Sequence, residues 1–446
     1  MATSSPHSLY SHYSYYSHYS FYSFYSFYSH YSHYQPLSRM ITNDKKNISS
    51  LNTPGGSPFD KVVDRSGSGD LKHGALLPRW GRDDLLPLWV ADMDFETPAF
   101  ITDALKKRLE HSLFGYTVMP DEFWTSIINW IRSHHQWEVR REWMSFIPGI
   151  VKGIGLAVNI FTKPDEKVII QPPVYHPFRL VPKGNGREVV YNPLRESNGT
   201  YVMDFDNLEK VADNKCRMLI LCNPHNPAGV CWDRDTLTRL ADFCRQRDIL
   251  VISDEIHCDM AIFGHKHIPF ASVSEAAREN SITFQAPTKT FNIAGLISSY
   301  SIIPNEQIRA RFYHWLQANE MDEATLFAPI ATIAAFEHGE PWRREMLSYV
   351  EDNIRFVENY CRENIPGIRP WRPQASFLVW LDCRSLRLTH EQLLDLFIDK
   401  AHLALNDGEM FGREEGHGFM RLNVATPRSI LRQALCQLAE AVRKYA

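Results

Sequence analysis

A single lysine stands out in an otherwise uncharged stretch of the chain. Lys289 follows the apolar, β-prone run SITFQAP and precedes the small, apolar run NIAGL, within residues 285–296. Fully buried lysines are rare unless they have a partner. A lysine that extends along apolar surface to reach solvent is one explanation of this position. An amine held ready for chemistry is the other, and residues elsewhere in the chain must decide.

Three other apolar, strand-like runs also end in residues that can take part in chemistry. With the lysine, the set comprises Tyr175, Asn223, Asn226, Asp254, His257 and Lys289. It offers an aromatic ring that can stack, amides that can hydrogen-bond, an anion and an amine. A heteroaromatic cofactor needs such a set: pyridoxal 5′-phosphate has an aldehyde that can join a lysine, a ring nitrogen, a phenolic oxygen, a flat face and a phosphate.

The elements that must position these residues alternate along the middle of the chain. Short β-prone runs occur at residues 166–170, 216–222, 249–254 and 281–285, and residues 234–248 have apolar side chains at helical spacing. Short aliphatic strands that alternate with helices are typical of a buried, mostly parallel sheet. Ligands bind beyond the carboxyl ends of the strands in such sheets. We therefore expect these residues to converge on one crevice.

The C-terminal third has a different pattern. Helical patterns at residues 341–364, 389–402 and 429–445 flank short strand-like runs at 376–382 and 418–424. This mixture is typical of a smaller α+β domain. We predict an α/β fold with an arm or linker at residues 40–88 that contributes to the small domain, a large, mostly parallel cofactor-binding domain at 89–325 and a small C-terminal domain at 326–446.

The first 39 residues are a low-complexity tail that we expect to be disordered. Residues 1–38 are a near-triplet repeat of Ser, Tyr, His and Phe without Lys, Arg, Asp or Glu. A secretory signal has a basic start and an aliphatic core, and a transit peptide is rich in arginine, so neither fits. We expect the tail to be dispensable, with Met40 as a candidate true start; metal binding by its histidines is the alternative.

Composition excludes several classes of protein. The chain has 446 residues, of which 44% are hydrophobic and 22% charged, with a net charge of -4. These values fit a soluble globular protein and offer no basic field for nucleic acid. No apolar run is long enough to cross a bilayer. The eight cysteines include no CxxC pair, so we expect reduced thiols, no metal site and a cytoplasmic location.

Several motifs together carry a resemblance to a known family. The segments SDEIH, NPHNPAG, APTKTFN and RLN resemble the class I/II aminotransferases, which are fold-type-I pyridoxal-phosphate enzymes. More narrowly, PLWVADMDF, FGYT, QPPVYHPF, SDEIHCDM and KTFNIAGL resemble the cystathionine β-lyase branch, the PatB/MalY-like carbon–sulfur lyases. The resemblance runs from about residue 52 to the C-terminus. It implies pyridoxal 5′-phosphate as the cofactor and an amino acid as the substrate.

The resemblance assigns roles around the cofactor ring. It implies that Lys289 joins the cofactor covalently and, once displaced by substrate, takes the Cα proton and delivers one to the leaving group. Asp254 pairs with the protonated ring nitrogen, with a helix cap as the alternative. Asn226 donates to the phenolic oxygen. His257 stands where many aminotransferases have a tyrosine with that role, and a structural histidine is the alternative. Tyr175 stacks on the ring face unless it is an ordinary core tyrosine.

The resemblance also implies a phosphate site at the start of a helix. The segment IPGIVKGIGLAV begins with Pro-Gly and continues as an apolar helix, and free backbone N–H groups at a helix N-terminus bind anions. We assign the phosphate to the backbone amides of Gly149, Ile150 and Val151. The hydroxyl of Thr288 replaces a serine that usually precedes the lysine.

Two further positions bear on the phosphate and on the active unit. Many aminotransferases have a phosphate-binding arginine eight residues after the lysine, where this chain has Ile297; the lyase branch also tends to lack that arginine. The resemblance implies that Tyr116, counted with the catalytic residues, contacts the phosphate from the neighbouring subunit. We therefore expect a homodimer with a shared active site.

The substrate carboxylate requires a cation. Arg421, in GFMRLN, is the candidate, because a guanidinium fork matches a carboxylate in two hydrogen bonds; a surface salt bridge is the alternative. Asn226 is assigned to the substrate as well. The strip WVADMDF is expected to line the pocket through Trp89, Asp92, Asp94 and Phe95.

These residues and the implied cofactor generate a carbanion at Cα, but they do not determine whether elimination or transamination follows. In β-elimination a thiol leaves from Cβ, and pyruvate and ammonia follow; in transamination a 2-oxo acid leaves. We expect a carbon–sulfur β-lyase acting on L-cystathionine or related cysteine S-conjugates, with a class I/II aminotransferase of broad specificity as the alternative. A transcription regulator with an aminotransferase-like domain is a third hypothesis, but no helix-turn-helix pattern accompanies it.

Overall fold

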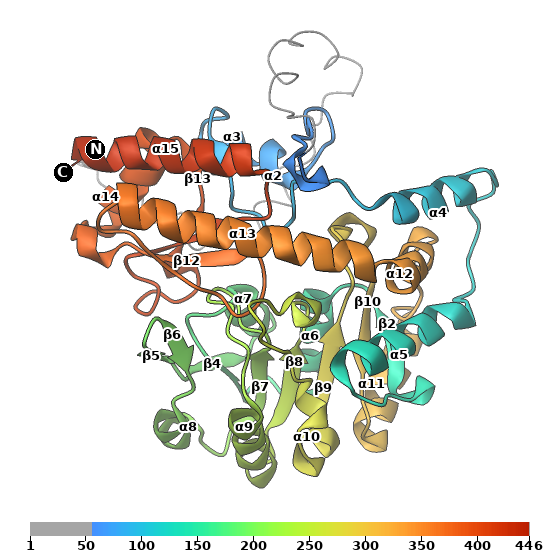
Figure 1. Ribbon diagram of the computed structural model, residues 1–446. Coiled ribbons are helices and arrows are strands. Elements are labelled where there is room, and N and C mark those ends of the chain that lie inside the picture. Colours follow the sequence, from blue (N-terminus) through green and yellow to red (C-terminus); the bar gives the residue numbers. More distant parts are fainter. Residues whose placement is uncertain (1–55, 446) are drawn as a thin grey trace, which may run out of the picture. The chain divides into compact units, whose positions relative to one another are not determined.

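Seven strands form the larger sheet of the computed structural model, which describes residues 56–445 (Figure 1). Their order is β2 (Met144–Ile147), β10 (Ser299–Ile302), β9 (Ser281–Gln285), β8 (Leu250–Asp254), β7 (Cys216–Cys222), β3 (Lys167–Ile170) and β4 (Glu188–Tyr191). Each pair from β9 to β4 is parallel, whereas β10 is antiparallel to both of its neighbours. The strands β2, β9, β8, β7 and β3 therefore all end at the same edge. The predicted mostly parallel sheet is confirmed.

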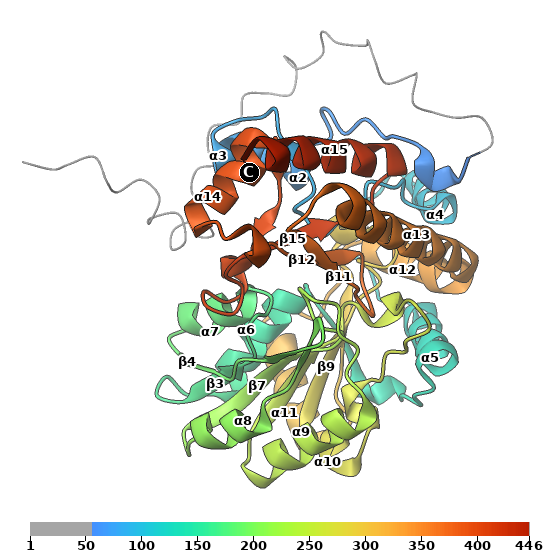
Figure 2. The same ribbon diagram turned by 60° about the vertical axis from the view of Figure 1, so that its left-hand side comes forward.

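Both faces of this sheet are covered, which explains why its strands are almost uniformly apolar. Every residue of β7, β8 and β9 is buried except Arg217. On β7, Met218 and Ile220 face one apolar core while Leu219 and Leu221 face another, as the period of two in a strand requires. The first core contains α6 (Ile150–Phe161), α7 (Pro177–Gly184) and α11 (Glu306–Ala318); the second contains α8 (Phe205–Val211), α9 (Arg234–Gln246) and α10 (Glu275–Glu279) (Figure 2).

A third group of helices packs beside β10 and β2. It comprises α4 (Ala99–Leu109), α5 (Asp121–His135) and α12 (Phe327–His338). Together with the strand faces, these helices bury a further apolar core. One pair of short strands, β5 (Arg195–Ser197) and β6 (Thr200–Val202), forms a hairpin before α8.

The C-terminal part contains a second, antiparallel sheet. Its order is β11 (Arg369–Trp371), β12 (Leu378–Asp382), β15 (Phe419–Asn423) and β14 (Asn406–Asp407). The helices α13 (Glu340–Asn364) and α15 (Arg428–Tyr445) run side by side over it and share its apolar core (Figure 1). α14 (His390–Asp395) precedes the last strands. The described residues belong to a single compact unit, so the division into domains at residues 88/89 and 325/326 remains a prediction.

The segment before the large sheet is tied to the C-terminal part. The short helices α2 (Leu71–Gly74) and α3 (Leu76–Trp80) lead into β1 (Leu86–Pro87), which pairs in parallel with β13 (Leu403–Ala404). The predicted tail lies outside the described residues. Within residues 56–445, no helix combines the length and apolarity needed to span a membrane.

Candidate active site

The strand ends bring a lysine and an aspartate together. Asp254 is the last residue of β8, and its backbone carbonyl accepts a hydrogen bond of 2.9 Å from the N–H of Asn223 on the neighbouring strand end. Lys289 follows β9, the strand on the other side. Its Nζ donates to the carbonyl oxygen of Ala91 at 2.5 Å. Each of the two charged groups perturbs the pKa of the other, so the structure places them in one electrostatic environment.

Burial shifts the pKa of each group in the direction that favours its neutral form. It raises the pKa of Asp254 to about 7, although the N–H of Ile256 donates to that carboxylate at 3.1 Å. It lowers the pKa of Lys289 to about 8, which increases the fraction of nucleophilic amine at neutral pH. A buried carboxylate without an ion-pair partner among residues 56–445 fits a cationic ring nitrogen, and a half-buried amine of lowered pKa fits an aldehyde.

Arg421 reaches the same place from the second sheet. It lies on β15 and is 3% exposed. Its Nη1 donates to Oδ1 of Asn226 at 3.1 Å and its Nη2 to the carbonyl of Trp89 at 2.8 Å. No acidic residue within residues 56–445 forms an ion pair with it, and burial lowers its pKa to about 10. A buried guanidinium without a counter-ion is costly, so this position fits a substrate carboxylate, and the alternative of a surface salt bridge does not apply.

The amides and rings predicted around the cofactor also converge. Because Oδ1 of Asn226 accepts from Arg421, its NH₂ group remains as a donor and meets no acceptor among the described residues. His257 is buried, and desolvation lowers its pKa to about 3, so the ring is neutral. Its Nδ1 has no partner in the described part of the chain. Tyr175 is half-buried, and the charges of Arg421 and Asp254 both act on its pKa, which burial raises.

The predicted phosphate site is a helix start with unused N–H groups. The first i→i−4 bond of α6 joins the N–H of Gly153 to the carbonyl of Gly149 at 2.8 Å. The N–H groups of Ile150 and Val151 therefore precede the helical ladder. Gly149 has φ 117°, a conformation that favours glycine. Thr288 is buried, and its hydroxyl forms no hydrogen bond with any described residue. These features fit a bound phosphate; the role of each residue remains a prediction.

The other two predicted positions are an exposed tyrosine and a buried phenylalanine. Tyr116 is fully exposed in the segment between α4 and α5 (Figure 1). Its contact with a phosphate of a second subunit remains a prediction. Phe95 is 5% exposed and packs edge-on against Phe59 at 4.9 Å between ring centroids. Its assignment to the substrate also remains a prediction.

The two aspartates of the strip WVADMDF hold the N-terminal segment. Arg65 pairs with Asp92 at 3.0 Å and with Asp94 at 2.8 Å. The fully buried Lys72 pairs with Asp94 at 2.8 Å. Sequence reasoning placed these aspartates at the pocket but missed the two cations; the signal was a pair of acidic residues in an apolar strip, which requires counter-ions.

A buried polar network that sequence reasoning missed lies next to Asp254. Glu255 is completely buried and accepts hydrogen bonds from Ser253 at 2.9 Å and from Gln285 at 3.0 Å. The ring of His267 forms a hydrogen bond of 3.0 Å with the same carboxylate. This network ties the ends of β8 and β9, which carry Asp254 and the segment of Lys289, to one another.

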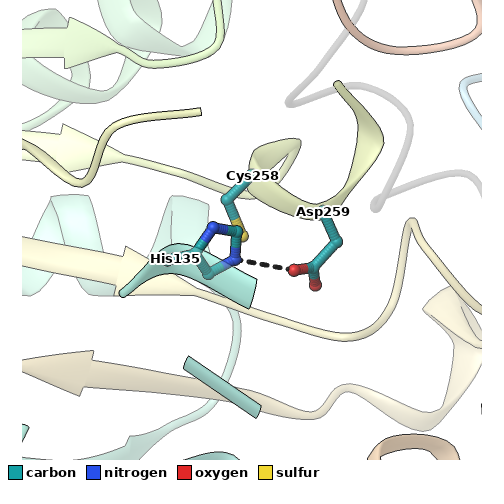
Figure 3. A group of neighbouring side chains, drawn as sticks. All are labelled: His135, Cys258 and Asp259. Carbon is teal, nitrogen blue, oxygen red and sulfur yellow. Dashed lines mark hydrogen bonds and ion pairs between the residues drawn. The ribbon is translucent and has the colours of Figure 1, made fainter. Parts of the chain in front are cut away.

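His135, Cys258 and Asp259 come together nearby (Figure 3). They are the one group of at least three potential metal-binding side chains in the described part of the chain, with ligand atoms within 4.8 Å of one another. One oxygen of Asp259 already accepts from His135 at 2.8 Å and from Trp130 at 2.9 Å. Burial raises the pKa of Cys258, which disfavours the thiolate. We interpret the group as a structural contact between α5 and the turn after β8; the predicted absence of a metal is not tested by it.

Comparisons with known proteins cover nearly the whole described chain. The family model described as aminotransferase class I and II matches residues 83–438. The chain is 40% identical to cystathionine β-lyase PatB of Bacillus subtilis, over 86% of this chain and 99% of PatB. It is 33% identical to protein MalY of Escherichia coli, over 86% of this chain and 98% of MalY. A solved structure of a PLP-bound putative aminotransferase from Clostridium difficile has a TM-score of 0.84 and 41% identity, covering 86% of this chain and 99% of that chain.

Proposed function

The chain belongs to the aminotransferase class I and II family, and from that premise we propose that it is a carbon–sulfur β-lyase that uses pyridoxal 5′-phosphate. Its substrates are L-cystathionine or related cysteine S-conjugates, which it converts to a thiol, pyruvate and ammonia. One observation carries the choice of elimination: the chain is 40% identical to a cystathionine β-lyase over 99% of that protein. The resemblance to the PatB/MalY branch that the motifs indicated is confirmed at the level of family and relatives.

In the proposed reaction, Lys289 transfers protons and Arg421 binds the substrate. Bound pyridoxal 5′-phosphate withdraws electrons from the substrate, so that the Cα proton becomes acidic. Lys289 takes that proton on Nζ and supplies a proton to the sulfur as the Cβ–S bond breaks. Arg421 holds the α-carboxylate through its two η nitrogens and thereby fixes the direction of Cα. One water is consumed overall, and the carbon skeleton of the cysteine half leaves as pyruvate while its nitrogen leaves as ammonia.

The other residues hold and orient the cofactor. Asp254, ionised, keeps the ring nitrogen protonated, which maintains the electron withdrawal. The NH₂ group of Asn226 and Nδ1 of His257 have no partners among the described residues, and both would hydrogen-bond to polar atoms of the bound ring. Tyr175 would stack on one face of the ring, while the N–H groups of Ile150 and Val151 would bind the phosphate.

We extend the proposal to the assembly and location of the enzyme. The active unit is a homodimer in which Tyr116 of one subunit contacts the phosphate of the other. Its support is the exposed apolar surface around Tyr116, where Leu113, Phe114 and Val118 are also exposed. The location is cytoplasmic, which the eight free cysteines support.

An aminotransferase of broad specificity is the second candidate, because one similar structure is described as a putative aminotransferase. One assay separates the two reactions. The purified enzyme receives L-cystathionine with no 2-oxo acid present. We expect pyruvate and a thiol to appear together in equal amounts. A turnover that strictly requires a 2-oxo acid acceptor would contradict the lyase and favour the aminotransferase.

A further inference from the structure

A second arginine without a counter-ion lies near Arg421. Arg79 is in the last turn of α3, and its guanidinium carbon lies over the rings of Trp80 at 4.9 Å and Trp89 at 4.6 Å. Its Nη2 donates to Oδ1 of Asn406 at 3.2 Å and to the sulfur of Met410 at 3.1 Å. Its other N–H groups have no acceptor in residues 56–445, and no acidic side chain there lies within ion-pair distance of it.

Hydrogen bonds connect this guanidinium to the proposed carboxylate site. Asn406, which accepts from Arg79, donates through Nδ2 to the carbonyl of Trp89 at 2.8 Å. The same carbonyl accepts from Nη2 of Arg421 at 2.8 Å. The two arginines are also close enough for the charge of Arg79 to lower the pKa of Arg421.

Positive charge exceeds negative charge at this end of the site. Desolvation, together with the charges of Arg421, Arg79 and Arg179, lowers the pKa of the half-buried ring of His176 to about 3, so that the ring is neutral. The acidic group that acts on Arg79 is Asp407, and burial raises the pKa of that carboxyl. Neighbouring guanidinium groups repel one another and are costly to desolvate. A ligand with two negative groups relieves both costs.

We propose that Arg79 forms a second anion subsite, which binds a carboxylate on the leaving-group half of the thioether while Arg421 holds the α-carboxylate. The inference rests on the proposed lyase function and names its substrate class: cysteine thioethers whose sulfur substituent ends in a carboxylate. The ring faces of Trp80 and Trp89 hold the guanidinium of Arg79 in place. L-Cystathionine belongs to this class, whereas S-alkyl cysteines do not.

A purely structural Arg79, stacked between tryptophans to order the N-terminal segment, is the competing explanation. It predicts that replacing Arg79 lowers kcat/KM equally for substrates with a charged tail and for substrates with a neutral tail. The experiment therefore compares two substrates of nearly the same shape, S-carboxymethyl-L-cysteine and S-carbamoylmethyl-L-cysteine. They differ by a carboxylate in place of an amide.

The measurements are kcat/KM for pyruvate release by the holoenzyme and the dissociation constant of each amino acid by calorimetry. We expect the wild type to favour the carboxylate by about tenfold or more, chiefly through KM and the dissociation constant. In Arg79→Gln the ratio of kcat/KM for the carboxylate substrate to kcat/KM for the amide substrate should fall towards one. Arg79→Lys should restore it partly, because lysine keeps the charge without the fork. The control Arg82→Gln, which removes an arginine already paired with Asp84 and Asp399, should keep the wild-type ratio.

The outcomes separate the two levels of the proposal. Equal efficiency and equal affinity for the two amino acids in the wild type overturn the second subsite, as does an unchanged ratio in Arg79→Gln. Preferential binding of the carboxylate without pyruvate release from either compound contradicts the lyase function and leaves the subsite supported.

Discussion

At the scale of the residue, the site contains three charged groups that have no ion-pair partner among residues 56–445. Asp254, Lys289 and Arg421 are all desolvated, and burial moves each pKa towards the neutral form. Each of them has a complementary group in the proposed complex: the ring nitrogen, the aldehyde and the substrate carboxylate. We infer that part of the binding free energy of cofactor and substrate comes from removing these desolvation costs.

The carboxyl of Asp254 provides a test in the cofactor-free protein. Its pKa of about 7 when folded exceeds the value of about 3.9 in an unfolded chain, so the folded state binds more protons between these values. The free energy of unfolding should therefore fall as pH rises from 4 to 7. Above pH 7 the destabilisation caused by the ionised, buried carboxylate should be fully present. Asp254→Asn removes the cost. We expect its free energy of unfolding, relative to wild type, to rise by roughly 3 kcal/mol between pH 4.5 and pH 8.

Urea unfolding of both cofactor-free proteins across this pH range measures the difference. The same substitution should abolish activity, because the amide cannot hold the ring nitrogen protonated. A pH-independent difference in stability would show that the carboxyl titrates normally, contrary to its burial.

At the scale of the element, patterns that depend on neighbours in sequence could be predicted and distant pairings could not. The strands β7, β8 and β9 were predicted because burial on both faces requires continuous aliphatic runs. β10 was missed, since its sequence SYSI carries two serines and no such run. The pairing of Arg65 and Lys72 with Asp94 joins residues 29 and 22 positions apart, respectively, and Glu255 with Gln285 joins residues 30 apart. No local pattern specifies such contacts, whereas Asp254 and Lys289 stood out in the sequence because each lies at, or just after, the end of its own strand.

The loop that carries Asn226 provides a test of how the two sheets are joined. Gly229 has φ 67°, and its carbonyl accepts from the N–H groups of Gln374 and Ala375 at 2.8 and 2.9 Å. A Cβ there would lie 2.5 Å from both the carbonyl oxygen of Ala375 and Cβ of Pro373. We expect Gly229→Ala to lower the free energy of unfolding by about 2–4 kcal/mol, from backbone strain and the clash together.

Denaturant unfolding and lyase activity should both report this change, because the loop also positions the amide of Asn226. Gly186→Ala is the matched control. Gly186 has φ 76° but open space around the position of its Cβ, so its substitution should cost only the strain, about 1 kcal/mol. Equal losses in the two variants would show that the contact between loop and second sheet is unimportant.

At the scale of the whole molecule, one exposed apolar surface has the character of a protein–protein contact. It lies at the end of α4 and in the segment that follows, and comprises Leu109, Leu113, Phe114, Tyr116 and Val118. Contiguous exposed apolar side chains are uncommon on monomers and mark interaction sites. In the homodimer that we propose, this segment would contribute Tyr116 to a second copy of the chain, which would cover the surface and account for the predicted phosphate contact.

Hybrid dimers decide whether Tyr116 acts in its own site or in that of its partner. Lys289→Ala lacks the amine that we propose for catalysis, and Tyr116→Ala lacks the predicted phosphate contact, so each should be impaired as a homodimer. After unfolding and refolding of an equal mixture, about half of the dimers should contain one subunit of each kind. If Tyr116 serves the neighbouring site, each hybrid places both defects in one site and leaves the other intact, so activity should recover to about a quarter of the wild-type value. If it serves its own subunit, each hybrid contains two impaired sites and the mixture should show no recovery. Refolding each variant alone controls for activity changes caused by the procedure, and size-exclusion chromatography verifies that the mixed species are dimers.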